Sequence, residues 1–521
     1  MGVRLAVGPW SAAEDTHLLA SRPNHRDRRT AGWGQLRPLP LRPVRSFSEH
    51  LNAPTGRGAL RDHPHSGAAG GAPCGDLVRI AVRIEGDRVT EAGFDAEGCG
   101  ALTAAGSAVV ELIEPGGFLE AARVGAQEIA DALGGLTPPK RHAAELGADA
   151  LHRALGKAAK DGAVGAETSP RRTLVAMSGG VDSAAAAQLA LDAGDEVVAV
   201  TLELWSDPGT DGELSCCSPQ AVRGARELAH RMGIPHVTLD LRKRFRAEVV
   251  DRFLDGYAAG RTPNPCVRCN GEVRFDAMLE LAGALGAARL ATGHYARIAR
   301  DDRGPLIRAA ADPRKDQSYM LAKLDPALLD RLSFPLGGLT KDAVRALARE
   351  AGLPVADKRE SQDLCFVAGL GGRAFLERHG GSRLRRPGEI VDRQGTVLGH
   401  HEGQHNYTVG QRRGLGLATP EPLYVLERDA TSNRVIVGPR EALATRRVGL
   451  EDATLHRDPG EVETVRLRYH AEPIACRVHV QEDGALELEL DQTANGVAPG
   501  QLACLMRQDR VVGEGTIGEP R

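Results

Sequence analysis

The chain has 521 residues, of which 42% are hydrophobic and 26% are charged, and its formal net charge is −3 at pH 7. This length allows roughly three or four domains, and the near-neutral charge excludes a uniformly basic chain, so contacts with nucleic acid have to come from local patches. The sequence has no apolar window of about 18 residues and no apolar core followed by a cleavage site near its start, which predicts a cytoplasmic protein without membrane insertion. Its nine cysteines favour metal, persulfide or redox chemistry over a disulfide framework.

The sequence of the first part of the chain predicts three segments: an extension, a small module and a linker. Residues 1–46 are rich in Arg, Pro and His and are expected to be disordered. Residues 47–157 predict an α+β module, with strands at 77–84 and 89–94 and helices at 102–113, 126–133 and 143–157. Residues 158–172 contain Gly, Ser and Pro and are expected to form the linker.

The middle of the chain alternates strands with helices. The strands are predicted at 174–177, 196–204, 236–239 and 289–292, and the helices at 184–193, 219–232, 243–258 and 272–285. This alternation predicts an α/β domain over 173–380, with a parallel sheet covered by helices on both faces. Residues 300–380 are expected to add mostly helix, including 340–350 with Thr340 as N-cap.

Short β runs separated by Gly, Asn and Pro follow Pro387. They lie at 388–392, 423–427, 434–437, 464–469 and 485–489. This pattern predicts a small central domain over 381–446 and a C-terminal β-barrel over 447–521.

A glycine turn between a strand and a helix is the most informative motif. Residues 178–183 read Ser-Gly-Gly-Val-Asp-Ser, and such a turn brings backbone N–H groups and the positive end of a helix to one point, which suits a polyphosphate. The motif is neither a Walker loop nor a dinucleotide fingerprint, and it resembles the PP-loop of ATP pyrophosphatases. Asp182 is expected to hold Mg²⁺, to orient the loop or to cap the helix.

Three cysteines lie in two further motifs. Residues 262–270 read Thr-Pro-Asn-Pro-Cys-Val-Arg-Cys-Asn, with a helix expected to start at Gly271. The helix end and Arg268 both favour thiolates at Cys266 and Cys269. Cys365 lies in Ser-Gln-Asp-Leu-Cys-Phe at 361–366. By itself the Cys-x-x-Cys pair fits a zinc half-site, a redox pair or a chance spacing.

Taken together, these motifs resemble those of the tRNA-specific 2-thiouridylase (MnmA) family. The matching segments are 178–183, 262–270, 291–296, 315–319, 361–366 and 399–416, in the family's order. The resemblance implies replacement by sulfur of the C2 oxygen of uridine 34 in tRNAs for Lys, Glu and Gln. It also implies ATP and Mg²⁺ as cofactors, and a cysteine desulfurase or sulfur-relay protein as partner.

The resemblance also implies a set of site residues. Cys269 would be the nucleophile and Cys365 the persulfide acceptor, joined in a disulfide during catalysis. The ATP-binding residues would be Met177, Ser178, Gly179, Gly180, Val181, Asp182, Ser183, Leu202, Gly293 and His294. The tRNA-binding residues would be Lys315, Asp316, Gln317, Ser318, Tyr319, Arg385, Arg386, Gln411, Arg412 and Arg413.

One position departs from that family. Many members carry Asp where this chain has Cys266, so Cys266, Cys269 and Cys365 together are a candidate set of thiolate ligands for a 4Fe–4S cluster. A persulfide relay and a cluster mechanism therefore both stay open.

Residues 47–157 resemble the NifU/IscU iron–sulfur scaffold. Two of the three scaffold cysteines match at Cys74 and Cys99, whereas the third position, after His142, is Ala143. Asp76 and His142 remain as candidate ligands, so a labile cluster, a zinc ion or no metal all fit. A module used only for docking is a further alternative.

Two other functions compete with tRNA thiolation. One is a PP-loop ligase in which an amine attacks the adenylate and no cysteine is needed. The other is an iron–sulfur carrier or scaffold fused to a PP-loop enzyme with another substrate. The pair Cys269 and Cys365 distinguishes thiolation from the first alternative, and the intact glycine turn argues against a carrier alone.

Overall fold

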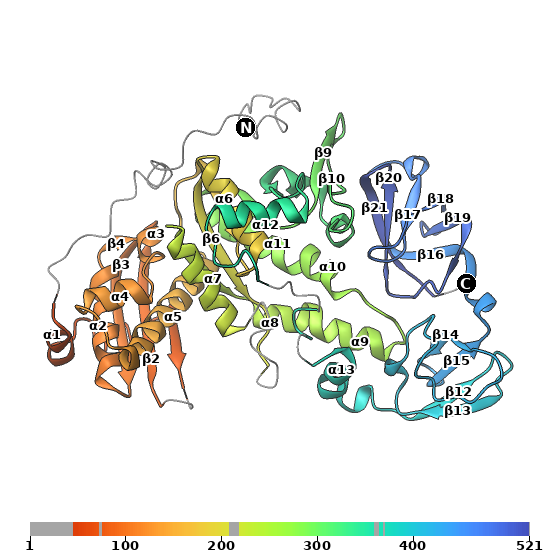
Figure 1. Ribbon diagram of the computed structural model, residues 1–521, viewed down its shortest axis with the longest axis horizontal. Helices are drawn as coiled ribbons and strands as arrows, with labels where there is room; N and C mark the ends of the chain where they lie inside the picture. Colours follow the sequence, from red (N-terminus) through yellow and green to blue (C-terminus); the bar gives the residue numbers. More distant parts are fainter. Residues whose placement is uncertain (1–44, 72–74, 208–217, 359–363, 368–369, 520–521) are drawn as a thin grey trace.

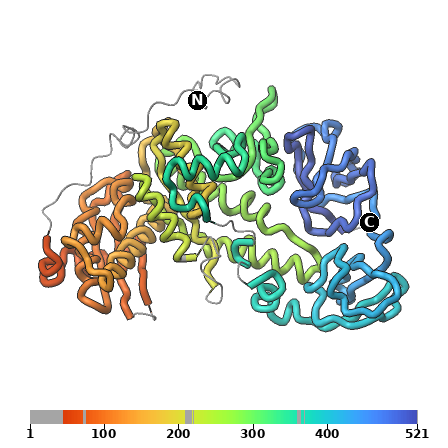
Figure 2. The backbone as a smooth tube through the Cα atoms, in the orientation of Figure 1, coloured from red at the N-terminus to blue at the C-terminus, as the bar shows by residue number. Residues whose placement is uncertain are grey.

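The computed structural model describes residues 45–71, 75–207, 218–358, 364–367 and 370–519. An α+β module lies at one end of the molecule, a parallel-sheet domain lies in the middle, and two β-rich domains lie at the other end (Figure 1). The tube in Figure 2 passes through these parts in sequence order, from the red module to the blue barrel. The predicted extension up to residue 44 and Cys74 lie outside the described residues.

The N-terminal module is built on an antiparallel sheet in the order β1 (Ser66–Gly70), β2 (Leu77–Glu85), β3 (Arg88–Glu97) and β4 (Gly116–Gly117). Its helices are α1 (Phe47–Asn52), α2 (Gly100–Ile113), α3 (Phe118–Ala121), α4 (Ala126–Ala132) and α5 (Pro138–Lys160). Val78, Ile80 and Val82 alternate along β2 and are fully buried, because they pack in one apolar core with α2 and α5. The predicted α+β class is confirmed.

The middle domain holds a five-stranded parallel sheet in the order β11-β8-β5-β6-β7. The strands are β5 (Ser169–Ala176), β6 (Glu196–Glu203), β7 (His236–Asp240), β8 (Ala287–Thr292) and β11 (Leu332–Ser333). Leu174 of the central strand pairs with Val198 on one side and Leu290 on the other. The turn after β5 therefore opens at the carboxyl edge in the middle of the sheet, where open α/β sheets bind ligands.

Helices connect these strands as predicted. They are α6 (Val181–Asp192), α7 (Pro219–Arg231), α8 (Arg242–Phe245), η2 (Arg246–Asp251), α9 (Arg252–Ala258), α10 (Pro265–Cys269), η3 (Asn270–Arg274), α11 (Phe275–Ala284) and α12 (Lys341–Glu350). Thr340 caps α12, since its side chain accepts from the Ala343 N–H. The expectation of mostly helix over 300–380 was wrong at its start, where β9 (Arg297–Asp301) and β10 (Gly304–Arg308) form a hairpin and Arg308 pairs with Arg510 of the barrel.

Two β-rich domains complete the fold. The central one has α13 (Gly372–Gly380) and a sheet in the order β13 (Val397–His401), β12 (Gly388–Val391), β15 (Arg434–Gly438) and β14 (Tyr424–Asp429). The barrel runs β16 (Ala444–Leu455), β19 (Leu486–Asn495), β18 (Ile474–Val480), β17 (Thr464–Arg466), β20 (Leu502–Arg507) and β21 (Arg510–Ile517). It closes because β21 also pairs with β16, which confirms the predicted barrel.

The N-terminal module packs directly on the β7 edge of the parallel sheet. Helix α5 approaches so closely that a Cβ on Gly156 would lie 1.7 Å from the Thr238 carbonyl oxygen. The His236 N–H donates to the Ala122 carbonyl at 2.9 Å, and one apolar core runs through both parts. Within the predicted linker, Gly165 N–H donates to Gly86 and Ala166 N–H to Ala284, so both domains hold this segment.

Buried polar groups join the same two domains. Asp149 of α5 accepts from Arg223 at 2.6 Å and from Arg226 at 2.5 Å, and Arg226 is only 4% exposed. The ring of His152 lies between the carbonyls of Val124 and His236, at 3.0 and 2.9 Å. Burial, and after it the charge of Arg226, holds the pKa of His152 well below its ordinary value.

Within the described ranges, no helix is both long and apolar enough to cross a membrane.

Candidate functional site

The glycine turn between β5 and α6 is closed by its own serines. Ser183 Oγ accepts from the Ser178 N–H and donates to the Gly180 carbonyl, both at 3.1 Å. Gly179 has a φ of +71°, a conformation that favours glycine. Gly293, at the end of β8, leaves no room for a side chain, because a Cβ there would lie 2.8 Å from the Ser183 nitrogen. The turn therefore presents backbone N–H groups at the start of α6, as a phosphate site requires.

The other predicted ATP-binding side chains lie beneath this turn. Met177, Val181 and Leu202 are 2%, 4% and 8% exposed, so they support the turn from the core. The Thr201 hydroxyl donates to the Met177 carbonyl at 2.8 Å. Thr201 also meets His236 Nε2 at 2.8 Å, which links the turn to the edge strand under the N-terminal module.

Asp182 is held by two side chains: Tyr295, which belongs to the motif at 291–296, and Lys341, which the sequence analysis missed. Lys341 Nζ lies 2.7 and 2.8 Å from its two carboxylate oxygens, and the Tyr295 hydroxyl donates to it at 2.8 Å. A second lysine, Lys358, donates to the Gly179 carbonyl at 3.1 Å. The N-cap position of α6 is Gly180, so Asp182 is not the helix cap that was one of its expected roles. Both lysines come from segments far along the chain, so motif spacing could not reveal them.

His294 lies beside the turn with its ring packed between aromatic side chains. The ring centroids of Phe275 and Phe334 are 5.8 and 6.2 Å away, and Nδ1 meets the Thr292 hydroxyl at 2.8 Å. Burial, and after it Arg274, lowers the pKa of His294 to about 3, so the imidazole is neutral. A neutral ring can accept a hydrogen bond from an adenine base or donate one to it. The contact of His294 with ATP stays a prediction.

Cys266 and Cys269 both lie in α10, which starts at Pro265 and not at Gly271 as expected. Asn264 is the cap: its Oδ1 accepts from the Cys266 and Val267 N–H groups at 3.1 and 3.3 Å. Cys266 is therefore in the first turn, where the helix end favours a thiolate. Cys269 is buried at the end of α10, with 6% exposure.

Cys365 lies in the short described segment 364–367, which is anchored by the next residue. Phe366 is 2% exposed, and its ring lies 5.4 Å from Phe253 and 5.0 Å from Phe375. Cys365 is half-buried against the same apolar core that contains Cys269. Their pairing as a disulfide stays a prediction.

The predicted scaffold ligands are partly brought together. Asp76 Oδ1 accepts from the Cys99 N–H at 2.8 Å, and Cys99 Sγ donates to Asp76 Oδ2 at 3.3 Å. Gly98 makes this approach possible, since a Cβ there would lie 2.1 Å from Asp76 Oδ1. His142 instead lies 3.7 Å from Glu145. Among the described residues, which include Cys266, Cys269 and Cys365, no group of three or more His, Cys, Asp or Glu side chains is arranged to hold a metal ion.

The predicted tRNA-binding loop 315–319 is largely a domain joint. Asp316 and Ser318 are 5% and 0% exposed, and Asp316 accepts from Arg466 of the barrel at 2.6 Å. Tyr319 is 1% exposed and donates to the Leu502 carbonyl at 2.8 Å. Gln317 accepts from the Tyr295 N–H at 2.9 Å. Direct RNA contact by Asp316, Ser318 and Tyr319 does not fit this burial, and Lys315 of the same loop is half-buried.

The predicted basic groups of the central domain are exposed. Arg385 and Arg386 follow α13, and Arg412 and Arg413 lie on the turn before β14. Gln411 shapes that turn, since it accepts from the Thr408 N–H and donates to the Arg413 carbonyl. These four arginines are placed as phosphate contacts require.

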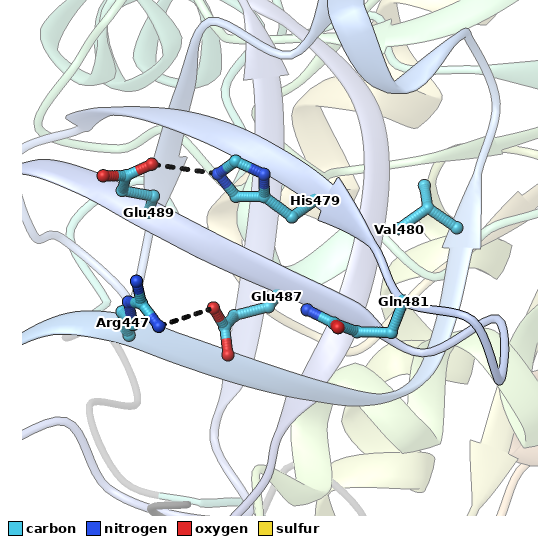
Figure 3. A pocket seen from close by; sticks show the side chains of 6 residues that line it. All are labelled: Arg447, His479, Val480, Gln481, Glu487 and Glu489. Carbon is cyan, nitrogen blue, oxygen red and sulfur yellow. Dashed lines mark hydrogen bonds and ion pairs between the residues drawn. The ribbon is translucent and has the colours of Figure 1, made fainter.

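A polar hollow of about 330 Å³ on the outside of the barrel holds none of the predicted residues (Figure 3). Its charges pair with each other: His479 meets Glu489 at 2.9 Å, and Arg447 lies 3.8 Å from Glu487. The hollow is therefore not the nucleotide site.

The fold and the turn define an ATP-using α/β enzyme joined to an iron–sulfur scaffold-like module. Four family models match in order: the NifU-like N terminal domain (45–161), the tRNA methyl transferase HUP domain (171–369), the tRNA methyl transferase PRC-barrel domain (373–439) and the aminomethyltransferase beta-barrel domain (450–517). The bifunctional protein NifU/MnmA of Rubrobacter xylanophilus is 47% identical over 482 residues, which cover 90% of this chain and 97% of that protein. The chain belongs to this NifU/MnmA family.

Shorter relatives match without the N-terminal module. The tRNA-specific 2-thiouridylase MnmA of Acidithiobacillus ferrooxidans is 45% identical over 67% of this chain and 98% of its own length. The same enzyme of Azorhizobium caulinodans is 47% identical over 68% of this chain and 94% of its own. Among solved structures, an NMN synthetase of Francisella tularensis aligns with 37% of this chain and 66% of its own, at 19% identity and a TM-score of 0.24.

Proposed function

We propose that the chain is an ATP-dependent tRNA 2-thiouridylase that converts uridine 34 to 2-thiouridine in tRNAs for Lys, Glu and Gln. The main support is the glycine turn (residues 178–183), the proposed phosphate turn, at the carboxyl edge of the sheet. The domain that contains it also carries Cys269 and Cys365 in one apolar core. Members of the same family named as 2-thiouridylases align with almost their whole length.

In the first step the O2 atom of the uridine attacks the α-phosphorus of ATP, and the bond to the β-phosphate breaks to release pyrophosphate. The N–H groups at residues 179–183 hold the phosphates, because they converge at the start of α6. Bound Mg²⁺ would neutralise part of the triphosphate charge, and Asp182 would reach it only by giving up its ion pair with Lys341. Lys341 and Lys358 add positive charge beside the turn.

Sulfur transfer would then follow on the adenylated base. The terminal sulfur of a persulfide on Cys365 attacks C2, and AMP leaves. The Cys269 thiolate attacks the Cys365 sulfur, which breaks the S–S bond, releases 2-thiouridine and leaves a Cys269–Cys365 disulfide. An external thiol reduces that disulfide before the next turnover.

The N-terminal module would dock the sulfur donor or handle sulfur or a cluster for the same chain. Cys99 and Asp76 are in contact, and Cys99 is exposed, so this thiol is the group of the module that would exchange sulfur. The donor would be a cysteine desulfurase or a sulfur-relay protein. Because both domains hold residues 158–172, delivery by a swinging module is not favoured.

Nucleoside mass spectrometry tests the function. The full chain is incubated with ATP, Mg²⁺, unmodified tRNA, a cysteine desulfurase and cysteine, and the tRNA is digested. We expect 2-thiouridine with the wild type and none with Cys269→Ser or Cys365→Ser. An amine-dependent ligase would make AMP equally well in both variants and would form no 2-thiouridine.

A further inference from the structure

Thr262 forms hydrogen bonds with both C-terminal domains. Its N–H donates to the Pro499 carbonyl of the barrel at 2.8 Å, and its own carbonyl accepts from the Gln501 side chain at 2.6 Å. Its hydroxyl accepts from Arg428 Nη2 of the central domain at 2.8 Å. All three polar groups of one loop residue are therefore used by two other domains.

The loop and its partners are shaped for this close approach. Gly260 has a φ of +76°, and a Cβ there would lie 2.6 Å from the Arg428 carbonyl oxygen. On the barrel side, a Cβ at Gly500 would lie 3.0 Å from the Arg261 Cβ and 3.1 Å from the Thr262 nitrogen. Both domains thus reach the loop only because glycine stands at each contact.

Arg428 is an unusual group to find at such a joint. It is 6% exposed, and its Nε and Nη1 atoms are buried without a hydrogen-bond partner in the described part of the chain. The guanidinium carbon lies 5.5 Å from the centre of the Tyr257 ring, and burial lowers the pKa of Arg428 to about 10. A buried cation without a paired carboxylate contributes little to the stability of a fold. Stability therefore does not explain the contact between Arg428 and Thr262.

The residues after Thr262 can pass a displacement on to the cysteines. Pro263 and Pro265 fix their own φ angles and restrict the residues before them, which are Thr262 and Asn264. Asn264 in turn caps α10 through the Cys266 and Val267 N–H groups. A shift at Thr262 is therefore carried into α10 and not absorbed by the loop.

We propose that Thr262 is a positioning residue through which the central domain and the barrel together set the place of Cys266 and Cys269. This role rests on the proposed function, because only thiol chemistry needs Cys269 held to within a fraction of an ångström. The central domain, which carries the exposed arginines, and the barrel would then hold α10 only when both are correctly placed.

A set of matched variants tests this role. Thr262→Val removes only the hydroxyl contact, Thr262→Ser keeps it, and Arg428→Met removes the donor. Arg434→Met is the control, because Arg434 is an exposed arginine on the neighbouring strand that pairs with Glu389. Two quantities are measured: the rate of Cys269 alkylation by iodoacetamide in the enzyme alone, and kcat and KM for tRNA thiolation.

For Thr262→Val and for Arg428→Met we expect faster Cys269 alkylation and a kcat lowered about tenfold, with the KM for tRNA within about twofold. Since both remove the same contact, the double variant should be no worse than either single one. Thr262→Ser and Arg434→Met should match the wild type.

The proposal would be overturned if Thr262→Val kept the alkylation rate and the kcat of the wild type. A rise in the KM for tRNA alone would also overturn it, because Thr262 and Arg428 would then contact tRNA directly. If Arg428→Met does not fold, the isosteric Thr262→Val decides. If the wild type makes no 2-thiouridine, the proposed function fails, whereas the alkylation rates still decide whether Thr262 positions Cys269.

Discussion

The ion pair between Asp182 and Lys341 sets the charge beside the phosphate turn. Lys341 is 6% exposed and touches both oxygens of a carboxylate that is itself part of the glycine motif. The sequence alone identified Asp182, because its motif is local, but Lys341 is 159 positions away and belongs to no motif in the sequence analysis. Side chains that reach a site from distant elements are set by the tertiary fold, which local spacing does not encode.

Lys341→Met should slow AMP formation by roughly 100-fold, because charge developing on the α-phosphate loses a fixed cation. Binding of tRNA should stay within about twofold, since the exposed arginines lie on another domain. AMP release with tRNA present and a filter-binding isotherm measure the two effects. Lys243→Met, at an exposed position on α8, is the control. Unchanged AMP formation in Lys341→Met would remove this lysine from the site.

Glu514 makes the stability of the barrel depend on pH. Burial, opposed by Lys323, raises the pKa of Glu514 to about 7, well above the 4.5 of an ordinary glutamate. Between about pH 4.5 and pH 7 the folded chain keeps a proton that the unfolded chain loses, so this group's contribution falls as pH rises, by at most about 1.4 kcal/mol per unit.

Glu514→Gln should therefore gain thermal stability relative to the wild type as pH rises from 5 to 8, because glutamine resembles the neutral acid. Scanning fluorimetry at several pH values measures the difference in Tm. Glu482→Gln, an exposed position of the barrel, should show no such trend. A constant difference for Glu514→Gln across this range would mean that the carboxyl group is ionised throughout.

Secondary structure was predictable wherever the apolar pattern was strong. The strands of the parallel sheet follow from buried runs such as Val197–Val200, which no loop would carry. The hairpin β9–β10 was not predictable, because β9 is polar and half-exposed and the position of the hairpin depends on pairing with the barrel. The start of α10 could have been found from Asn264 followed by Pro265, a common cap and first helical residue.

Docking of the N-terminal module depends on polar side chains spaced along α5, and these gave no signal in the sequence. Asp149, His152 and Arg153 recur at helical spacing, so they share one face of α5, on which Gly156 also lies. Their partners lie on α7, β6 and β7, about 50 to 90 residues later in the chain. A pattern of this kind is indistinguishable from a solvated helix face until the partner surface is known.

Asp149→Ala should loosen this interface, because it leaves the buried Arg226 without its carboxylate, a loss of about 3–5 kcal/mol when a buried pair is broken. We expect faster proteolytic cleavage in 161–168 and faster hydrogen exchange in β7. Asp131→Ala, an exposed carboxylate on α4, is the control. Equal cleavage rates in the two variants would show that the module is held by its apolar core alone.

At the scale of the whole molecule, the arrangement separates three tasks. The scaffold-like module lies at one end, the phosphate turn lies in the middle, and the exposed arginines lie on a domain at the other end (Figure 1). The chain therefore combines a net charge of −3 with exposed arginines on one domain.

The affinity for tRNA should fall steeply as salt concentration rises. The double variant Arg412→Glu and Arg413→Glu should flatten the slope of log K against log salt by about 1.5, since each lost phosphate contact removes roughly 0.7–0.9. Filter binding at KCl concentrations from about 50 to about 300 mM measures this slope. An unchanged slope would place the tRNA surface elsewhere.

A single-turnover experiment tests the coupling of adenylation to sulfur transfer most directly. The full chain is loaded with persulfide, freed of donor and reductant, and mixed with ATP, Mg²⁺ and unmodified tRNA. This coupling predicts equal amounts of 2-thiouridine, AMP and a disulfide-linked pair of peptides containing Cys269 and Cys365, all measured by mass spectrometry. Formation of 2-thiouridine without the linked peptides, or by the Cys365→Ser variant, would contradict it.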